Sequence, residues 1–225
     1  MHIEPGIVEG AKMTLGIATA IGAAGYTVKL AMDMARRDGV VTLASRMLIA
    51  SVLVLCFFQV LPRYPVGVSE VHFILGSTLF LMFGAAPAAV GLAVGLLAQG
   101  LLFSPYDLPQ YGMNVTTLLV PLFAVSALAQ RIIPTNTAYK DVTYTQALKL
   151  SMAFQGGVVL WVGFWAFYGY GATAETLASV TAFGAAYMAV VLIEPVLDLG
   201  LLAAVKSLSG AAESKLFHAR LGRAA

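Results

Sequence analysis

Long apolar stretches, separated by short polar segments, dominate the pattern of residues along this chain. Most of them approach the ~20 apolar residues that a helix needs to cross a bilayer. They predict helices at 11–34, 44–61, 70–84, 86–103, 115–133, 147–169 and 174–205. The stretches 70–84 and 86–103 are short and separated only at Ala85-Ala86-Pro87, so they could instead form one long kinked helix.

Composition supports a membrane environment. Of the 225 residues, 60% are hydrophobic and only 11% are charged, and the mean hydropathy is +0.86. Soluble domains carry about a quarter charged residues. We therefore expect an all-α integral membrane protein with a bundle of about seven transmembrane helices.

The distribution of Lys and Arg distinguishes between the two helix counts. With seven spans and the N-terminus outside, ten basic residues fall on the inner side: Arg36, Arg37, Arg46, Arg131, Lys140, Lys149, Lys206, Lys215, Arg220 and Arg223. Only Lys12 and Arg63 fall outside, and Lys29 lies within the first helix. Cytoplasmic loops carry such an excess of positive charge. Merging residues 70–103 into one helix would reverse every later loop, so the charges favour seven spans with a tight inner turn near Pro87.

This topology predicts a single transmembrane domain over residues 1–205, followed by a basic cytoplasmic tail at 206–225. It brings two of the three histidines to the same face. His2 lies at the outer tip, and His72 lies two residues into the predicted third helix. The third, His218, is expected to be solvated in the tail.

The first residues have a particular metal chemistry. The α-amino nitrogen of Met1, the amide nitrogen between residues 1 and 2, and the Nδ1 atom of His2 can form fused chelate rings around one ion. Three nitrogens in a plane suit Ni(II), Cu(II) or Co(II). A histidine at position 2 can also arise by chance, so this interpretation needs support from the rest of the chain.

Polar residues within membrane segments are costly and are therefore candidates for function. A metal-bound imidazole needs an acceptor for its second N–H, and Glu70, Gln99 and Asn114 are candidates. Asn114 could instead cap the fifth helix. Glu194-Pro195 is expected to kink the last helix rather than bind a ligand.

Several motifs are absent from the sequence. It contains no G-x-x-x-x-G-K-[ST] loop, no H-E-x-x-H and no G-x-S-x-G. We therefore expect neither an ATPase nor a familiar hydrolase.

In order along the chain, several motifs resemble those of one family. Met1-His2-Ile3 opens the chain, Gln59 precedes Tyr64-Pro65, and Gly67-Val68-Ser69-Glu70-Val71-His72 follows. Leu96 to Phe103 contains Gln99, Tyr111-Gly112-Met113-Asn114 comes next, and Leu192-Ile193-Glu194-Pro195 is a weaker match. Together they resemble the substrate-binding membrane subunit of energy-coupling-factor transporters for cobalt or nickel, the CbiM/NikM type.

The resemblance implies a function and a ligand set. Met1 and His2 would supply three nitrogens and His72 the fourth, around one Co(II) or Ni(II) ion carried as substrate, with no permanently bound cofactor. Gln59, Gln99 and Asn114 would lie in or behind the site. Glu4-Pro5 and Glu70-Val71 depart from the family pattern and could change the metal preference.

The resemblance also implies partners and a location. They are a separate transmembrane coupling subunit and cytoplasmic ATPase subunits, in the plasma (inner) membrane of a prokaryote, with no nucleic acid. An alternative is a related multi-pass subunit for an organic micronutrient, such as a vitamin or a corrinoid, with Gln59, Gln99 and Asn114 lining a larger pocket. A membrane interaction protein without a ligand is a third possibility.

Overall fold

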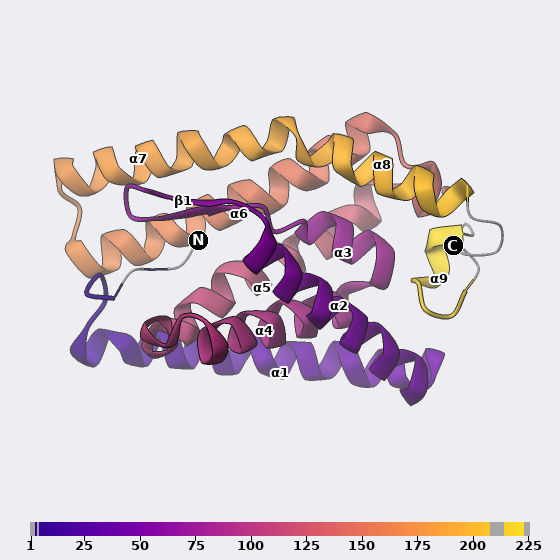
Figure 1. Ribbon diagram of the computed structural model, residues 1–225, viewed down its shortest axis with the longest axis horizontal. Helices are drawn as coiled ribbons and strands as arrows, with labels where there is room; N and C mark the ends of the chain where they lie inside the picture. Colours follow the sequence, from indigo (N-terminus) through magenta and orange to yellow (C-terminus); the bar gives the residue numbers. More distant parts are fainter. Residues whose placement is uncertain (1–2, 4, 208–213, 223–225) are drawn as a thin grey trace.

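The structure, a computed structural model, describes residues 3, 5–207 and 214–222. Its helices run mainly along the long axis of an elongated bundle, with the two chain ends toward opposite ends of that axis (Figure 1). The main helices are α1 (Met13–Asp38), α2 (Val40–Val60), α3 (Gly76–Phe83), α4 (Ala85–Leu102), α5 (Tyr111–Ile132), α6 (Tyr144–Tyr170), α7 (Ala174–Met188), α8 (Glu194–Ser207) and the short α9 (Ala219–Gly222).

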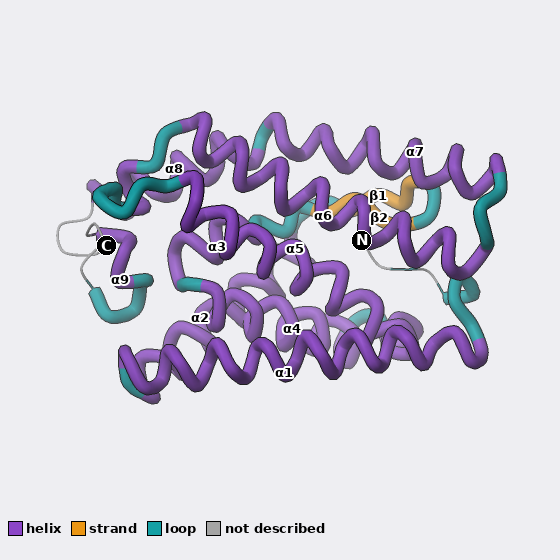
Figure 2. The backbone as a smooth tube through the Cα atoms, turned by 180° about the vertical axis from the view of Figure 1, so that it is seen from behind, coloured by secondary structure: helices purple, strands orange, loops and turns teal. Residues whose placement is uncertain are grey.

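Smaller elements connect these helices. Four 3-10 turns are η1 (Gly10–Lys12), η2 (Pro105–Gln110), η3 (Tyr139–Asp141) and η4 (Ala189–Leu192). Strands β1 (Arg63–Val66) and β2 (Ser69–His72) pair in an antiparallel hairpin. Figure 2 shows this hairpin as the one sheet among the described helices.

The expected all-α membrane bundle is confirmed, with one local correction. Within the described residues, six helical stretches are long and apolar enough to cross a membrane: Gly10–Asp38, Val40–Val60, Ala85–Leu102, Pro105–Ile132, Tyr144–Tyr170 and Ala174–Ala204. The predicted span 70–84 is wrong as a helix, because its first residues belong to β2. What remains is α3, whose 8 residues rise only about 12 Å.

A β-turn explains the hairpin. Gly67 and Val68 are the two residues between the paired positions Val66 and Ser69. Gly67 has φ 59° and occupies the first central position, as a type II′ turn requires. The hairpin then packs on α7, where a Cβ atom on Gly67 would lie 2.2 Å from the Ser179 carbonyl oxygen.

The break between α3 and α4 lies where the sequence predicts it, within a few residues. It falls at Gly84, which has φ 91°. Pro87 occupies the first turn of α4, where its missing N–H leaves no hydrogen bond unmade. The last predicted helix is likewise interrupted by η4, which ends at Leu192, with one residue between it and Glu194-Pro195.

Close packing of α4 on α2 depends on small residues. Cβ atoms on Gly91 and Gly95 would lie 2.7 Å from the Ala50 Cβ and 2.5 Å from the Val54 Cγ1. Stripes of small residues at four-residue spacing let membrane helices approach closely. The small residues Gly91 and Gly95 of α4 therefore pack against α2 of the same chain.

The described part of the C-terminal tail is packed rather than solvated, contrary to expectation. Leu221 is fully buried, and the Phe217 ring stacks on Phe83. The His218 ring stacks on Tyr139 at 5.3 Å, and its backbone N–H donates to the Met82 carbonyl at 2.6 Å. Residues 214–222 therefore close one end of the bundle.

Candidate metal centre at the N-terminal end of the bundle

The backbone directly after His2 lies inside the protein. The Ile3 side chain has no solvent exposure, and the Ile3 N–H donates to Asn114 Oδ1 at 2.6 Å. Asn114 is 1% exposed and is the fourth residue of α5. It therefore does not cap this helix. Met1 and His2, the predicted ligands at the tip, lie outside the described residues.

Several contacts hold the N-terminal segment against the bundle. The chain turns at Pro5-Gly6, where Gly6 has φ 96°, and Ile7 and Val8 are buried. A Cβ on Gly169 would lie 1.9 Å from the Ile7 carbonyl oxygen, so the segment passes directly over the end of α6.

Lys12 adds a polar contact at the same place. Its Nζ donates to the carbonyl oxygens of Tyr168 and Gly169 at 2.9 and 3.0 Å, and it lies 5.6 Å from the Tyr168 ring centroid. A cation at a helix C-terminus interacts favourably with its free carbonyl groups. The contacts of Ile7 and Lys12 thus hold the segment that follows Ile3 against the end of α6.

His72 is the last residue of β2 and is 2% exposed. Its Nε2 atom is 2.9 Å from Glu70 Oε2, and its ring lies edge-on to Phe58, with centroids 6.0 Å apart. Residues i and i+2 of a strand face the same side, which brings the Glu70 carboxylate to this imidazole. When Nε2–H donates to Glu70, Nδ1 carries the lone pair that can ligate a metal.

The two glutamines of the predicted site occupy different environments. Gln99, in α4, is fully buried, and neither atom of its amide has a hydrogen-bond partner among the described residues. Gln59 is exposed near the end of α2. The small cavity beside Asn114, about 10 Å³, is lined by Leu96 and Gly100, which flank Gln99 in sequence.

Buried polar residues near this end were missed by sequence reasoning. Ser104 and Gln110 flank or belong to η2, and they are 0% and 5% exposed. Ser104 Oγ and Gln110 Oε1 have no hydrogen-bond partner within the described residues. Their only sequence signal is a polar, Pro-containing segment between two apolar helices.

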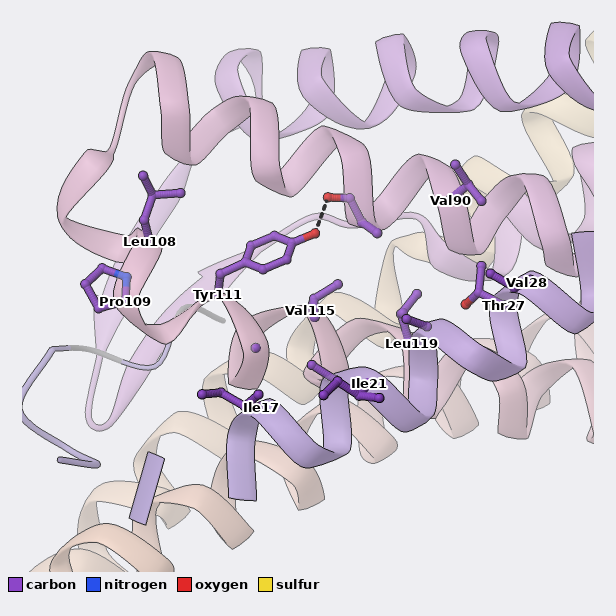
Figure 3. Close-up of a pocket in the computed structure, with 14 residues that line it drawn as sticks. Ile17, Ile21, Thr27, Val28, Val90, Leu108, Pro109, Tyr111, Val115 and Leu119 are labelled. Atoms are coloured by element: carbon purple, nitrogen blue, oxygen red, sulfur yellow. Dashed lines mark hydrogen bonds between the residues drawn. The ribbon is translucent and has the colours of Figure 1, made fainter. Parts of the chain in front are cut away.

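A separate cavity of about 580 Å³ lies between α1, α4 and α5 and is lined almost entirely by apolar side chains (Figure 3). The Tyr111 hydroxyl donates to the Ala93 carbonyl at 2.8 Å on its wall. None of the predicted site residues lines this cavity. Ile17 and Ile21, on its rim, are 58% and 67% exposed, as suits a face directed toward lipid.

Side chains of the described residues do not form a metal centre by themselves. Within residues 3, 5–207 and 214–222, no group of three His, Cys, Asp or Glu side chains could hold a metal ion. A centre at His72 therefore requires additional ligands. Backbone amide nitrogens and an N-terminal amine are ligands of a different kind from such His, Cys, Asp and Glu side chains.

Six long apolar helices define the class: this is a multi-pass integral membrane protein. A family model described as the cobalt uptake substrate-specific transmembrane region (CbiM) matches residues 2–211, and the chain belongs to this family. This family is described as a substrate-specific transmembrane component for cobalt uptake, which confirms the resemblance to the cobalt- or nickel-type subunit. No curated protein and no solved structure gave a significant match.

Proposed function

We propose that the chain captures one Co(II) or Ni(II) ion at the N-terminal end of the bundle. The ligands are the Met1 amine, the amide nitrogen between residues 1 and 2, the His2 Nδ1 atom and the His72 imidazole. The observation that carries the proposal is the hydrogen bond from the buried Ile3 N–H to Asn114 at 2.6 Å. It anchors the residue next to His2 within the bundle.

The surroundings of His72 support its role as the fourth ligand. Glu70 fixes the tautomer with Nε2 protonated and increases the basicity of the imidazole. Burial of His72 and the edge-on Phe58 ring restrict water around the metal and hold the imidazole in place. Neither Glu70 nor Asn114 needs to touch the ion.

The ligand chemistry limits the choice of metal. Deprotonating a backbone amide requires a strongly binding metal, and a planar nitrogen set suits Ni(II), Cu(II) and Co(II). The family description favours cobalt as the physiological substrate. Mg(II) and Ca(II) prefer oxygen ligands and are excluded as substrates of this site.

Energy for uptake comes from other subunits in this proposal. The chain has no phosphate-binding loop. A separate transmembrane coupling subunit and cytoplasmic ATPase subunits would convert capture into transport.

The alternative of an organic micronutrient receives no support from the described residues. The cavity beside Asn114 is about 10 Å³, roughly the space for one water. The cavity of about 580 Å³ is apolar, and none of Gln59, Gln99 and Asn114 lines it.

Equilibrium dialysis of the purified protein against Co(II) and Ni(II) tests the proposal. Inserting three alanines between Met1 and His2 keeps every side chain but moves the amine away from the His2 chelate. A single inserted residue would not do so, because a histidine at position 3 closes a four-nitrogen chelate with the amine and two amide nitrogens. We expect this insertion and His72→Ala each to weaken binding at least tenfold, since loss of even an outer partner of a metal site costs roughly that factor.

His218→Gln is the matched control, because His218 lies at the opposite end and packs on Tyr139. It should bind metal like the unmodified chain. Unchanged affinity in the insertion variant would contradict the role of the amine, and unchanged affinity in His72→Ala would contradict the role of His72.

A further inference from the structure

Two acidic residues of α8 are fully enclosed in the bundle, away from the proposed metal centre. Glu194 and Asp198 both have no solvent exposure. They are spaced four residues apart, so they lie on one face of the helix. The sequence suggested only a kink here, and the structure instead shows a polar cluster inside a membrane protein.

The cluster joins three helices. From α6, Ser151 and Gln155 both donate to Glu194 Oε2, with Gln155 Nε2 at 2.7 Å. From α3, Thr78 donates to Asp198 Oδ1. Ser77 lies between the two acids.

No fixed positive charge compensates this pair in the described residues. The groups that bond to the two carboxylates are hydroxyls and one amide, and no ion pair to either acid occurs among the described side chains. Two adjacent carboxylates in an apolar environment cannot both remain ionised without a large cost. A cation must therefore accompany them.

The number of hydrogens available at Ser77 favours a proton as this cation. Ser77 Oγ is 3.0 Å from Asp198 Oδ2 and 3.4 Å from Glu194 Oε1, but a hydroxyl has only one hydrogen. If it donates to Asp198, its lone pair can accept from a protonated Glu194. If it donates to Glu194, it can accept from a protonated Asp198. With one added proton, both contacts of Ser77 contain a hydrogen. With both acids ionised, the single Ser77 hydrogen serves only one contact, and the other has none.

Gln155 gives independent support. It is fully buried, its amide is in contact with Glu194, and its Oε1 has no hydrogen-bond partner in the described part of the chain. An amide can turn to present either Nε2–H to a carboxylate or Oε1 to a carboxylic acid. Ser151 can likewise donate or accept, so the surroundings fit both protonation states of Glu194.

A metal cation fits less well. The Ser77 hydroxyl already fills the gap between the two carboxyl groups, so an ion between them would have to displace it. A proton needs no such space.

We propose that Glu194 and Asp198 form a binding site for one exchangeable proton, which they share through the Ser77 hydroxyl. The proton moves from Glu194 Oε1 to Ser77 Oγ while the Ser77 hydrogen passes to Asp198 Oδ2, so that the total number of protons and charges is unchanged. This site is separate from the proposed metal centre. Buried carboxyl groups of this kind serve as proton relays in transport proteins.

Other titratable groups on the neighbouring elements are few. α3 and η4 carry none, α7 carries the exposed Glu175 at its start and the buried Tyr187 at its end, and α6 carries Lys149 and tyrosines near its ends. η3 contributes Tyr139, Lys140 and Asp141 to the contact with α8. None of them is among the hydrogen-bond partners of the two acids in the described residues.

Infrared difference spectroscopy of the full chain in lipid nanodiscs tests the site. At neutral pH we expect one carboxylic acid C=O stretching band that shifts in D2O and disappears as pH rises. Glu194→Gln and Asp198→Asn should each change the proton affinity reported by this band by about tenfold or more, because the like charge is removed. The double variant should lose the band.

Ser77 provides the sharper test, because it acts only through the two acids. Ser77→Ala should change the frequency and the midpoint of the band, and Ser77→Thr, which keeps a hydroxyl, should restore both. Ser51→Ala is the matched control, since the Ser51 hydroxyl bonds only to the backbone of its own helix. Glu175→Gln controls for loss of an exposed carboxylate.

Three results would overturn the proposal. One is absence of a titrating acid band from the unmodified chain, and another is persistence of the band in the double variant. The third is loss of the band at constant pH when choline is replaced by Na⁺, which would assign the site to a metal cation. The first and third use the unmodified chain, so they hold even if a variant fails to fold.

Discussion

A single hydrogen bond to the backbone defines the surroundings of Asn114 in the structure. Its position in the sequence was compatible with a helix cap or with a place behind the metal. The structure shows it as the fourth residue of α5, accepting from the Ile3 N–H. This could not be predicted from the sequence because it joins residues 111 positions apart. The motif at Met1-His2 was readable from the sequence, since its chemistry depends only on adjacent atoms.

Asn114→Ala should weaken metal binding with a modest loss of stability. The change leaves the buried Ile3 N–H without its acceptor, which costs about 1–3 kcal/mol. Because this bond anchors the segment next to His2, we expect affinity for Co(II) to fall roughly tenfold, which corresponds to a change in binding free energy of about 1.4 kcal/mol. Dialysis and thermal denaturation measure the two effects. Asn114→Asp keeps an acceptor and should bind better than the alanine variant, and equal binding by both would count against the anchor.

Glu70→Gln tests the residue that orients His72. Glutamine can still accept from Nε2–H through its amide oxygen, but it lacks the negative charge that makes the imidazole a stronger ligand. We expect metal affinity to fall roughly 10- to 100-fold, with little change in unfolding temperature. Titration calorimetry with Co(II) measures the affinity. Exposed Glu175→Gln is the control, and an unaltered affinity in Glu70→Gln would exclude the proposed orienting role.

At the scale of elements, long helices were predictable and the hairpin was not. Apolar runs of about twenty residues predicted seven spans, and six membrane-length stretches correspond to them in the described residues, because length and apolar composition decide whether a helix can cross a bilayer. The helix predicted at 70–84 was wrong at its first residues, because a short and mostly apolar run such as Val71 to Leu75 is compatible with a strand or a helix. The hairpin depends on Gly67 and on contact with α7, and only the first of these is visible in the sequence.

Gly67→Ala should destabilise the hairpin for two reasons, the positive φ and the close contact with α7. A second variant, Gly10→Ala, measures the first of them separately. Gly67 has φ 59°, and its new Cβ would lie 2.2 Å from the Ser179 carbonyl oxygen. Gly10 has nearly the same φ, 58°, but a Cβ added there would meet nothing within 4 Å, so Gly10→Ala carries the backbone cost alone, about 1 kcal/mol. We expect Gly67→Ala to lower the unfolding temperature more than Gly10→Ala. Equal effects would mean that the hairpin does not rest on α7.

At the scale of the whole molecule, the two ends of the bundle differ in their basic residues. Arg46 bonds to Asp38 and to the Lys215 carbonyl, while Arg220 bonds to the carbonyls of Ile133, Pro134 and Thr137. These basic residues, predicted for the inner side, thus meet at one end, near the C-terminus in Figure 1. Lys12 lies at the other end with the N-terminal segment. That the basic end faces the cytoplasm is still a prediction from the positive-inside rule.

His218 makes closure of this end dependent on pH. Burial, with Arg46 and Arg37 nearby, lowers the pKa of its imidazole from 6.5 to about 4, although Asp38 opposes the shift. The unfolded or undocked state therefore binds a proton more readily, so docking of residues 214–222 is most stable above pH 6.5 and weakens as pH falls toward 4. We expect amide hydrogen exchange in this segment, corrected for the intrinsic rate at each pH, to accelerate over that interval. His218→Gln cannot be protonated and should remove most of the acceleration, because the amide stays neutral on the Tyr139 ring. If the variant and the unmodified chain accelerate equally, groups other than His218 control the closure.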